Sequence, residues 1–216
     1  MRLSYRLASM AIRVLVRLFY KVELRGAEHI PTDQSFILAA NHQSNLDPPL
    51  IAAFVPRELV FVAKEQLFES FFLSTFLRYF NAIPINRAGV DLRAIRCIKG
   101  HLSNGRDLLV FPEGTRQPSN KLGKPRSGLG MIASGASTSV LPVLVRGSFQ
   151  RPGFILGRPR LLIQFCELLS KELYPVVDEK TTGKERKEHY ATITHLIFDR
   201  IRQSMESYEA HGSADR

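Results

Sequence analysis

The sequence has few cysteines, no long uninterrupted apolar run and a shortage of acidic side chains. Only two of its 216 residues are cysteine, Cys97 and Cys166, and neither belongs to a metal-binding spacing. A disulfide framework or a zinc site of ordinary spacing is therefore not expected. No apolar run reaches the roughly 20 residues that a membrane-spanning helix needs. We therefore expect no transmembrane segment.

The shortage of acidic residues leaves a large positive charge. Thirty Lys and Arg residues against 20 Asp and Glu give a formal net charge of +10. Such a surplus indicates an anionic partner, which could be nucleic acid, an anionic membrane surface or a phosphorylated substrate. Charge alone does not separate these. The length suits one domain with a full core and is short for two.

Residues 1–20 combine arginines with apolar residues. They resemble a secretion signal, but Arg13 and Arg17 interrupt the apolar region and no small-residue cleavage pattern follows, so we expect no cleavage. In a helix, Arg2, Arg6, Arg13 and Arg17 fall within an arc of roughly 60°. This pattern predicts a helix at a membrane interface, with its apolar side among acyl chains and its arginines on lipid phosphates. The alternative is a helix packed on the domain with a solvated basic edge.

Short apolar runs alternate with helical patterns along the rest of the chain, which is typical of α/β proteins. Strands are expected over residues 22–26, 36–40, 59–63, 82–86, 108–111, 139–145 and 161–165, and helices over 66–80, 91–103 and from Thr182 through Met205. Pro84 favours an edge position for its strand. The 66–80 helix is apolar nearly all round, which favours burial in the core, or alternatively a second membrane-contacting surface.

These elements predict a single α/β domain with a central mixed, mostly parallel sheet flanked by helices. We expect the domain to span residues 22–210, preceded by an amphipathic membrane-interface helix over 1–21 and followed by a flexible tail over 211–216. Residues 117–130, rich in Pro, Gly, Ser, Lys and Arg, are expected to form a mobile basic loop.

A polar turn over residues 41–48 follows the apolar strand at 36–40. If a helix starts at the Pro48-Pro49 pair, Asp47 would be its N-cap and could reach back to His42. An imidazole oriented by a carboxylate can remove a proton from a weak acid such as an alcohol. The alternatives are a metal ligand, or a capped helix start with a histidine nearby.

A second polar turn, residues 112–116, follows the strand at 108–111. Glu113, the backbone amides around Gly114 and the fork of donors on Arg116 would form a cradle for a phosphate group. The alternative is an ordinary turn, since Pro-Glu-Gly is a common turn sequence.

Four motifs in one order carry a family resemblance. They are Asn41-His42-Gln43-Ser44-Asn45-Leu46-Asp47, Ile85-Asn86-Arg87, Phe111-Pro112-Glu113-Gly114-Thr115-Arg116 and Val140-Leu141-Pro142-Val143. From about residue 22 to 170 the chain resembles the glycerolipid acyltransferase family, which contains the 1-acyl-glycerol-3-phosphate acyltransferases. The first and third motifs are specific in combination, whereas the second and fourth are weak by themselves. Gln117 and Asn86 depart from the residues frequent in the family.

The resemblance implies transfer of a fatty acyl group from acyl-CoA or acyl carrier protein to a hydroxyl of a lysophospholipid, above all 1-acyl-glycerol-3-phosphate. His42 would match the general base and Asp47 its orienting acid. The positions that would match acceptor binding are Arg87, Glu113, Gly114, Thr115 and Arg116, with Pro142 in a supporting strand. No metal and no cofactor are implied. We expect a peripheral or monotopic protein on the cytoplasmic face of an anionic membrane.

Other functions compete with this one. A non-catalytic, basic membrane-binding scaffold on the same fold would have no need of the base His42. A metal-dependent hydrolase using His42, Asp47 and Glu113 would need further clustered ligands. Nucleic-acid binding is disfavoured because no reading module is visible. An acylated Ser44 is less favoured than direct attack by the acceptor, because no GxSxG elbow surrounds it.

Overall fold

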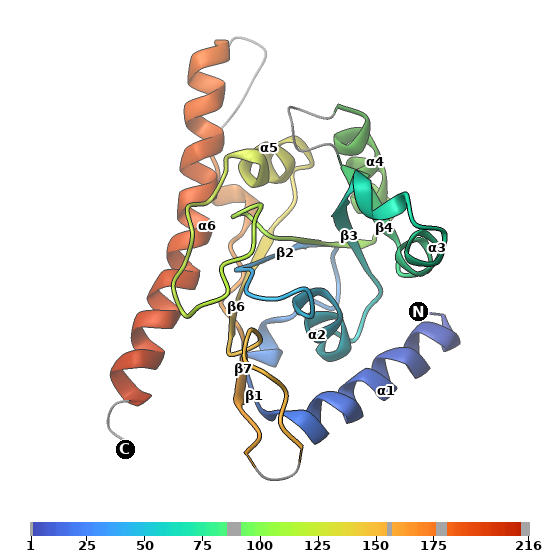
Figure 1. Cartoon of the computed structure of the whole chain (residues 1–216). Coiled ribbons are helices and arrows are strands. Elements are labelled where there is room, and N and C mark those ends of the chain that lie inside the picture. The colour runs from blue at the N-terminus through green and yellow to red at the C-terminus, as the bar shows by residue number, and fades with distance from the viewer. Residues whose placement is uncertain (1, 86–91, 155–156, 176–180, 213–216) are drawn as a thin grey trace.

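A seven-stranded sheet forms the centre of the molecule, in the order β1-β7-β6-β2-β5-β3-β4 (Figure 1). The computed structural model describes residues 2–85, 92–154, 157–175 and 181–212. The strands are β1 (Lys21–Arg25), β2 (Ile37–Ala40), β3 (Leu59–Lys64), β4 (Ala82–Ile85), β5 (Asp107–Val110), β6 (Val140–Arg146) and β7 (Arg160–Phe165).

Neighbouring strands from β6 to β4 pair in parallel, whereas β7 runs antiparallel to β6 and carries β1 parallel to itself. The predicted mixed, mostly parallel sheet is therefore confirmed. The strand β4 lies at one edge, as Pro84 indicated.

Helices cover both faces of the sheet. They are α1 (Leu3–Phe19), α2 (Asp47–Phe54), α3 (Phe71–Tyr79), α4 (Leu92–Ser103), α5 (Gly128–Gly135) and α6 (Gly183–Gly212), with 3-10 turns η1 (Ala27–His29), η2 (Glu65–Phe68) and η3 (Lys171–Leu173). Successive side chains of β2 point to opposite faces, so Leu38 and Ala40 pack with α1 and α2, whereas Ile37 and Ala39 pack with α4, α5 and α6. Burial on both faces explains why the central strands are apolar throughout.

Two helical predictions were inaccurate. The single helix expected over 66–80 is divided into η2 and α3, and Phe71 and Phe72 of α3 are strongly exposed, so burial in the core was wrong for them. The helix α5 begins inside the segment expected to be a loop. Gly130 explains its position: an added Cβ there would lie 2.0 Å from the carbonyl oxygen of Tyr190, so only glycine lets α5 approach α6 this closely.

The helix α1 packs on the domain through one face and exposes an apolar face to solvent. Tyr5 and Val16 are buried against the domain. The large apolar side chains that α1 exposes are Leu3, Leu7, Met10, Val14, Leu15 and Leu18. Arg13 was expected to face lipid phosphates with the other arginines of this helix. Instead, its guanidinium donates to the carbonyl oxygen of Ala53, at 2.6 and 2.9 Å, near the end of α2. An arginine is favoured there because the last carbonyls of a helix lack partners within it.

No helix in the described part of the chain has the length and apolar character needed to span a membrane.

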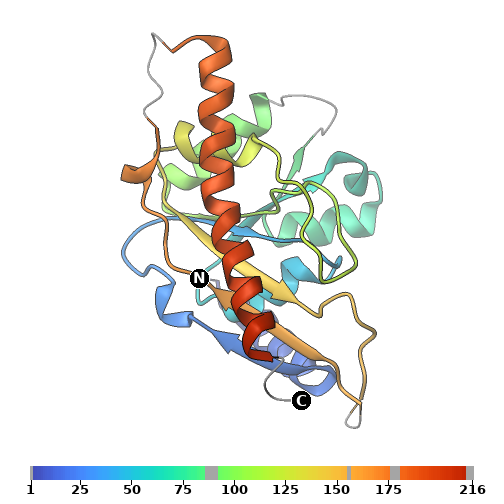
Figure 2. The same ribbon diagram turned by 90° about the vertical axis from the view of Figure 1, so that its left-hand side faces the viewer.

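The helix α6 runs along the whole molecule beside the sheet (Figure 2). The expected capping box is present: the Thr182 amide donates to Glu185 Oε2 at 2.9 Å, and the Glu185 amide donates to Thr182 Oγ1 at 3.3 Å. The buried side chains of this helix include Ile193, Ile197, Phe198 and Ile201, which complete the core on this side of the sheet.

Candidate active site

The first and third sequence motifs lie at the same edge of the sheet. The strand β2 pairs in parallel with β5, with Ala39 opposite Val110, so both strands end side by side. The turn with His42 follows β2, and the turn with Glu113 follows β5. The carboxyl ends of parallel strands are where α/β proteins usually bind their ligands.

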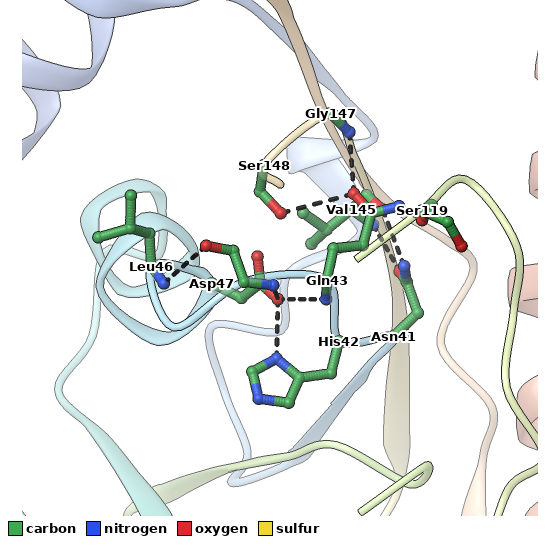
Figure 3. Close-up of polar contacts among 10 residues, drawn as sticks. Asn41, His42, Gln43, Leu46, Asp47, Ser119, Val145, Gly147 and Ser148 are labelled. Atoms are coloured by element: carbon green, nitrogen blue, oxygen red, sulfur yellow. Dashed lines mark hydrogen bonds and ion pairs between the residues drawn. The ribbon is translucent and has the colours of Figure 1, made fainter. Parts of the chain in front are cut away.

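The side chains of His42 and Asp47 contact each other directly at this edge of the sheet (Figure 3). His42 Nδ1 lies 2.8 Å from Asp47 Oδ2, and Asp47 is fully buried. A carboxylate can only accept, so Nδ1 carries the hydrogen and Nε2 keeps a lone pair for a substrate. The sequence-based expectation that Asp47 reaches back to His42 thus agrees with the geometry.

Asp47 is held by the backbone as well. Its Oδ2 accepts hydrogen bonds from the amides of Gln43, at 2.6 Å, and Ser44, at 2.8 Å. The helix α2 begins at Asp47, with Leu46 as the N-cap, so the expected capping position was one residue off. The two amide bonds fix the carboxylate independently of His42, which pre-organises the pair.

The ring of His42 also stacks on Phe111. The ring centroids are 4.1 Å apart with an interplanar angle of 23°. This contact was not predicted from the sequence, although Phe111 directly follows β5 and directly precedes the Pro-Glu-Gly turn. The stack fixes the ring plane of the histidine, while Asp47 fixes its rotation within that plane.

Two amide side chains flank His42: that of Asn41 binds the neighbouring strand β6, and that of Gln43 binds Gly147, directly after β6. Asn41 donates to the Val145 carbonyl at 2.8 Å and accepts from the Val145 amide at 2.7 Å, so it continues the β2–β6 pairing with its side chain. Gln43 accepts from the Gly147 amide at 2.9 Å and donates to the Ser119 carbonyl at 2.6 Å (Figure 3). Sequence reasoning assigned these residues no role, and their pairing with β6 depends on the tertiary fold.

The segment after the third motif is hydrogen-bonded to the His42 turn. The Gln117 amide donates to the His42 carbonyl at 2.7 Å, and the Arg126 amide donates to the Pro112 carbonyl at 2.9 Å. Together with the bond from Gln43 to Ser119, these contacts fold residues 117–126 beside the His42 turn. The expected basic loop therefore borders the site.

Glu113 is buried beside the His42–Asp47 pair. Its side chain is only 3% exposed, and neither carboxylate oxygen has a hydrogen-bond partner of good geometry in the described part of the chain. Burial raises the pKa of Glu113 from 4.5 to about 7, although the nearby backbone amides of Gly123 and His42 lower it in part. As a direct substrate contact, Glu113 stays a prediction.

The rest of the third motif faces outward. Thr115 and Arg116 are exposed, and Gly114 has a φ of +68°, which favours glycine. An added Cβ at Gly114 would lie 3.2 Å from Nε of Arg126, so a second arginine packs over this turn. Arg87, which was also expected to bind the acceptor, lies outside the described residues. From the sequence, Arg126 was expected only to belong to the basic loop over residues 117–130.

Lys64 also ends a strand at this edge. It is the last residue of β3, which pairs with β5, and it is exposed. Within the described ranges, no group of three or more His, Cys, Asp or Glu side chains is placed to hold a metal ion. The site therefore presents one histidine–carboxylate pair with basic side chains around it.

Comparison with known proteins gives a consistent result. The chain is 25% identical over 184 residues to the 1-acyl-sn-glycerol-3-phosphate acyltransferase of Bacillus subtilis, covering 81% of this chain and 92% of that protein. It is 30% identical over 188 residues to human 1-acyl-sn-glycerol-3-phosphate acyltransferase alpha, covering 86% and 62%. The crystal structure of the 1-acyl-sn-glycerophosphate acyltransferase PlsC from Thermotoga maritima matches with a TM-score of 0.70 at 29% identity, over 95% of this chain and 80% of that one. The model of the acyltransferase family matches residues 21–146, more than half of the sequence and including both turns, and the chain therefore belongs to the acyltransferase family.

Proposed function

We propose that this chain transfers a fatty acyl group from an acyl thioester to the free hydroxyl of 1-acyl-glycerol-3-phosphate, with His42 as general base. The names of the relatives support the acceptor. The single observation that carries the mechanism is the 2.8 Å contact between His42 Nδ1 and Asp47 Oδ2. It leaves Nε2 as the proton acceptor at the edge of the sheet.

The reaction needs only one activated group from the protein. A thioester is already reactive, so the slow partner is the hydroxyl, and His42 Nε2 takes its proton as the oxygen attacks the thioester carbonyl. The tetrahedral intermediate then collapses, the C–S bond breaks, and the His42 imidazolium returns the proton to the leaving thiolate. General-base assistance of this kind contributes roughly 10²–10⁴-fold to the rate. Asp47 stabilises the imidazolium between the two transfers.

Basic side chains at the edge of the sheet would hold the acceptor by its phosphate. Arg116 is exposed, follows the Gly114 turn and can form two parallel hydrogen bonds to a phosphate. Anchoring the phosphate places the hydroxyl in register with His42 and removes much of the entropic cost of the reaction. The donor is acyl-CoA or acyl carrier protein, both of which carry the acyl group as a thioester.

The acceptor is a lipid, and α1 offers a way to reach it. The outward apolar face of α1 would enter the acyl boundary of an anionic membrane on the cytoplasmic side. The net charge of +10 favours such a surface.

The mechanism is tested with His42→Ala. Because the base is lost, kcat with 1-acyl-glycerol-3-phosphate and an acyl thioester should fall by at least about 100-fold. The matched control is His195→Ala, which removes an exposed histidine on α6. Transfer by the His42 variant at the rate of the unaltered chain would contradict the mechanism.

The phosphate contact is tested with Arg116→Ala. Loss of a charge-assisted contact of about 1.5–3 kcal/mol should raise the KM for the acceptor roughly 10- to 100-fold and leave the KM for the thioester nearly unchanged. The control is Lys121→Ala, an exposed lysine in the same basic loop. An unchanged acceptor KM would remove Arg116 from the phosphate site.

A further inference from the structure

Three phenylalanines lie on the surface near the carboxyl edge of the sheet. Phe71 and Phe72, in the first turn of α3, are 79% and 84% exposed, and Phe154, between β6 and β7, is 60% exposed. The rings of Phe71 and Phe72 contact each other, with centroids 5.7 Å apart. Large apolar groups grouped on a surface usually mark an interaction site.

The segments that carry these phenylalanines, α3 and the β6–β7 connection, flank α1 at its two ends. At its start, the Arg2 side chain donates to the carbonyl oxygen of Tyr79, at 3.0 Å, in the last turn of α3. At its end, the ring of Phe19 contacts Phe154, with centroids 5.7 Å apart, and the Gly153 amide donates to the Phe19 carbonyl. Figure 1 shows the same arrangement, with α3 beside one end of α1 and the β6–β7 connection beside the other. Segments with exposed phenylalanines thus lie at both ends of α1.

The same segments leave the sheet at the edge that holds His42. The strand β3 leads into η2 and α3, and β6 leads into the connection with Phe154, while β2 leads into the His42 turn. Because β2, β3 and β6 are aligned in one direction, all three connections start at the carboxyl edge. A flat surface in contact with these phenylalanines would therefore lie next to the His42 turn.

We propose that Phe71, Phe72, Phe154 and the outward face of α1 form one membrane-contact surface that docks on an anionic bilayer with the His42 edge at the lipid interface. This inference deepens the proposed function, because it rests on a lipid acceptor. Charge selects the bilayer as the occupant: the chain carries a net charge of +10, and Arg6 and Arg17 are exposed along the border of the apolar face. A second copy of this chain would bring the same positive charge against itself.

The chain has no tryptophan, so one introduced indole reports a single position without background. Phe72→Trp and Phe154→Trp should each lose fluorescence on vesicles of phosphatidylglycerol and brominated phosphatidylcholine, and not on the same vesicles without bromine. The control is Leu173→Trp, which places the indole in η3, after the β7 strand that ends at the opposite edge of the sheet. Its fluorescence should not change. Phe71→Ser combined with Phe72→Ser should weaken vesicle binding at least about tenfold.

The outcomes separate this surface from the enzymatic proposal, because quenching does not depend on turnover. Quenching at position 72 and at position 154 supports the surface, even if His42→Ala keeps its activity. A lack of quenching at either position, when an indole at Val14 on α1 is quenched, would show that α1 binds alone and would overturn the proposal. The proposal would also be overturned if sedimentation showed a dimer in solution that Phe72→Ser dissociates, because the surface would then be a subunit interface.

Discussion

Glu113 is a buried carboxyl group next to a histidine–carboxylate pair, and its ionisation has a cost. Burial raises its pKa from 4.5 to about 7. The folded protein therefore binds this proton more tightly than the unfolded chain does. The associated stability is fully present below pH 4.5 and is lost as the pH rises through about 7, when the buried carboxylate must form.

Glu113→Gln should remove this pH dependence. Between pH 5 and pH 8, the free energy of unfolding of the unaltered chain should fall by on the order of 2–3 kcal/mol more than that of the variant. Urea unfolding at the two pH values measures both. Glu172→Gln, an exposed residue in η3, is the matched control and should follow the unaltered chain. Parallel pH profiles for Glu113→Gln and the unaltered chain would contradict the buried-carboxyl account.

The residues of the candidate site differ in how far sequence could predict them. The His42–Asp47 pairing is local, because five positions and a helix start at Asp47 suffice to bring the two side chains together. The stack of His42 on Phe111 and the burial of Glu113 depend on β2 and β5 being neighbours, which no local pattern specifies. The roles of Thr115 and Arg116 stay predictions, since exposure alone does not identify a ligand contact, and the role of Arg87 stays a prediction because this residue lies outside the described residues.

At the scale of elements, α1 both completes the core and exposes apolar residues. Removing it entirely would also remove the buried side chains of Tyr5 and Val16 and uncover the core on which they pack, so a deletion would test folding rather than membrane binding. The exposed positions can be changed separately. This distinction comes from the contacts of α1 with α2, which the helical pattern alone does not reveal.

Leu7→Ser, Val14→Ser and Leu18→Ser together should release the chain from anionic vesicles. All three side chains are exposed, so the substitutions should leave the thermal midpoint within a few degrees. The affinity for phosphatidylglycerol vesicles should fall by at least about 100-fold, because each side chain gains roughly 1.5–3 kcal/mol when fully buried. Co-sedimentation measures the change, and Leu196→Ser on α6 is the control. Undiminished binding by the triple variant would exclude α1 as the anchor.

Element types were easier to predict than element contacts. The strands were identified because runs such as 139–145 are apolar and bounded by turn residues. The helix α5 was missed because Gly128, Gly130 and Gly135 lower the helix propensity of a short segment, and its close packing on α6 outweighs that cost. The apolar pattern of α3 could not show that Phe71 and Phe72 face solvent.

At the scale of the whole molecule, Arg57 joins separate parts of the chain at the edge opposite the candidate site. Its guanidinium lies 2.7 Å from Asp107 Oδ2 and also donates to the Gln34 carbonyl at 2.7 Å. Asp107 in turn accepts from the Phe36 amide at 3.2 Å. Burial raises the pKa of Asp107 to about 6, against the opposing effect of Arg57. The start of β5 and the segments before β2 and β3 are thus held together by this ion pair and its hydrogen bonds.

Arg57→Ala should lower the free energy of unfolding by about 3 kcal/mol at pH 8, because it leaves a buried carboxylate without its partner. The loss should be smaller at pH 5, where Asp107 can take up a proton. Arg106→Ala, on the neighbouring exposed turn, should change stability by less than about 0.5 kcal/mol. Chemical denaturation provides the test, and an equal loss at both pH values would contradict the assignment. The kcat/KM of the folded enzyme should be unaffected by Arg57→Ala.

The helix α6 follows all seven strands of the sheet in the sequence, and this order has a consequence for biosynthesis. This helix is 30 residues long and supplies Ile193, Ile197 and Phe198 to the core. Because domains are completed from the N-terminus during synthesis, this face of the sheet remains without α6 until residues 183–212 have been translated. A nascent or prematurely terminated chain would expose that apolar face, so chaperones and proteases should recognise such products while sparing the finished protein.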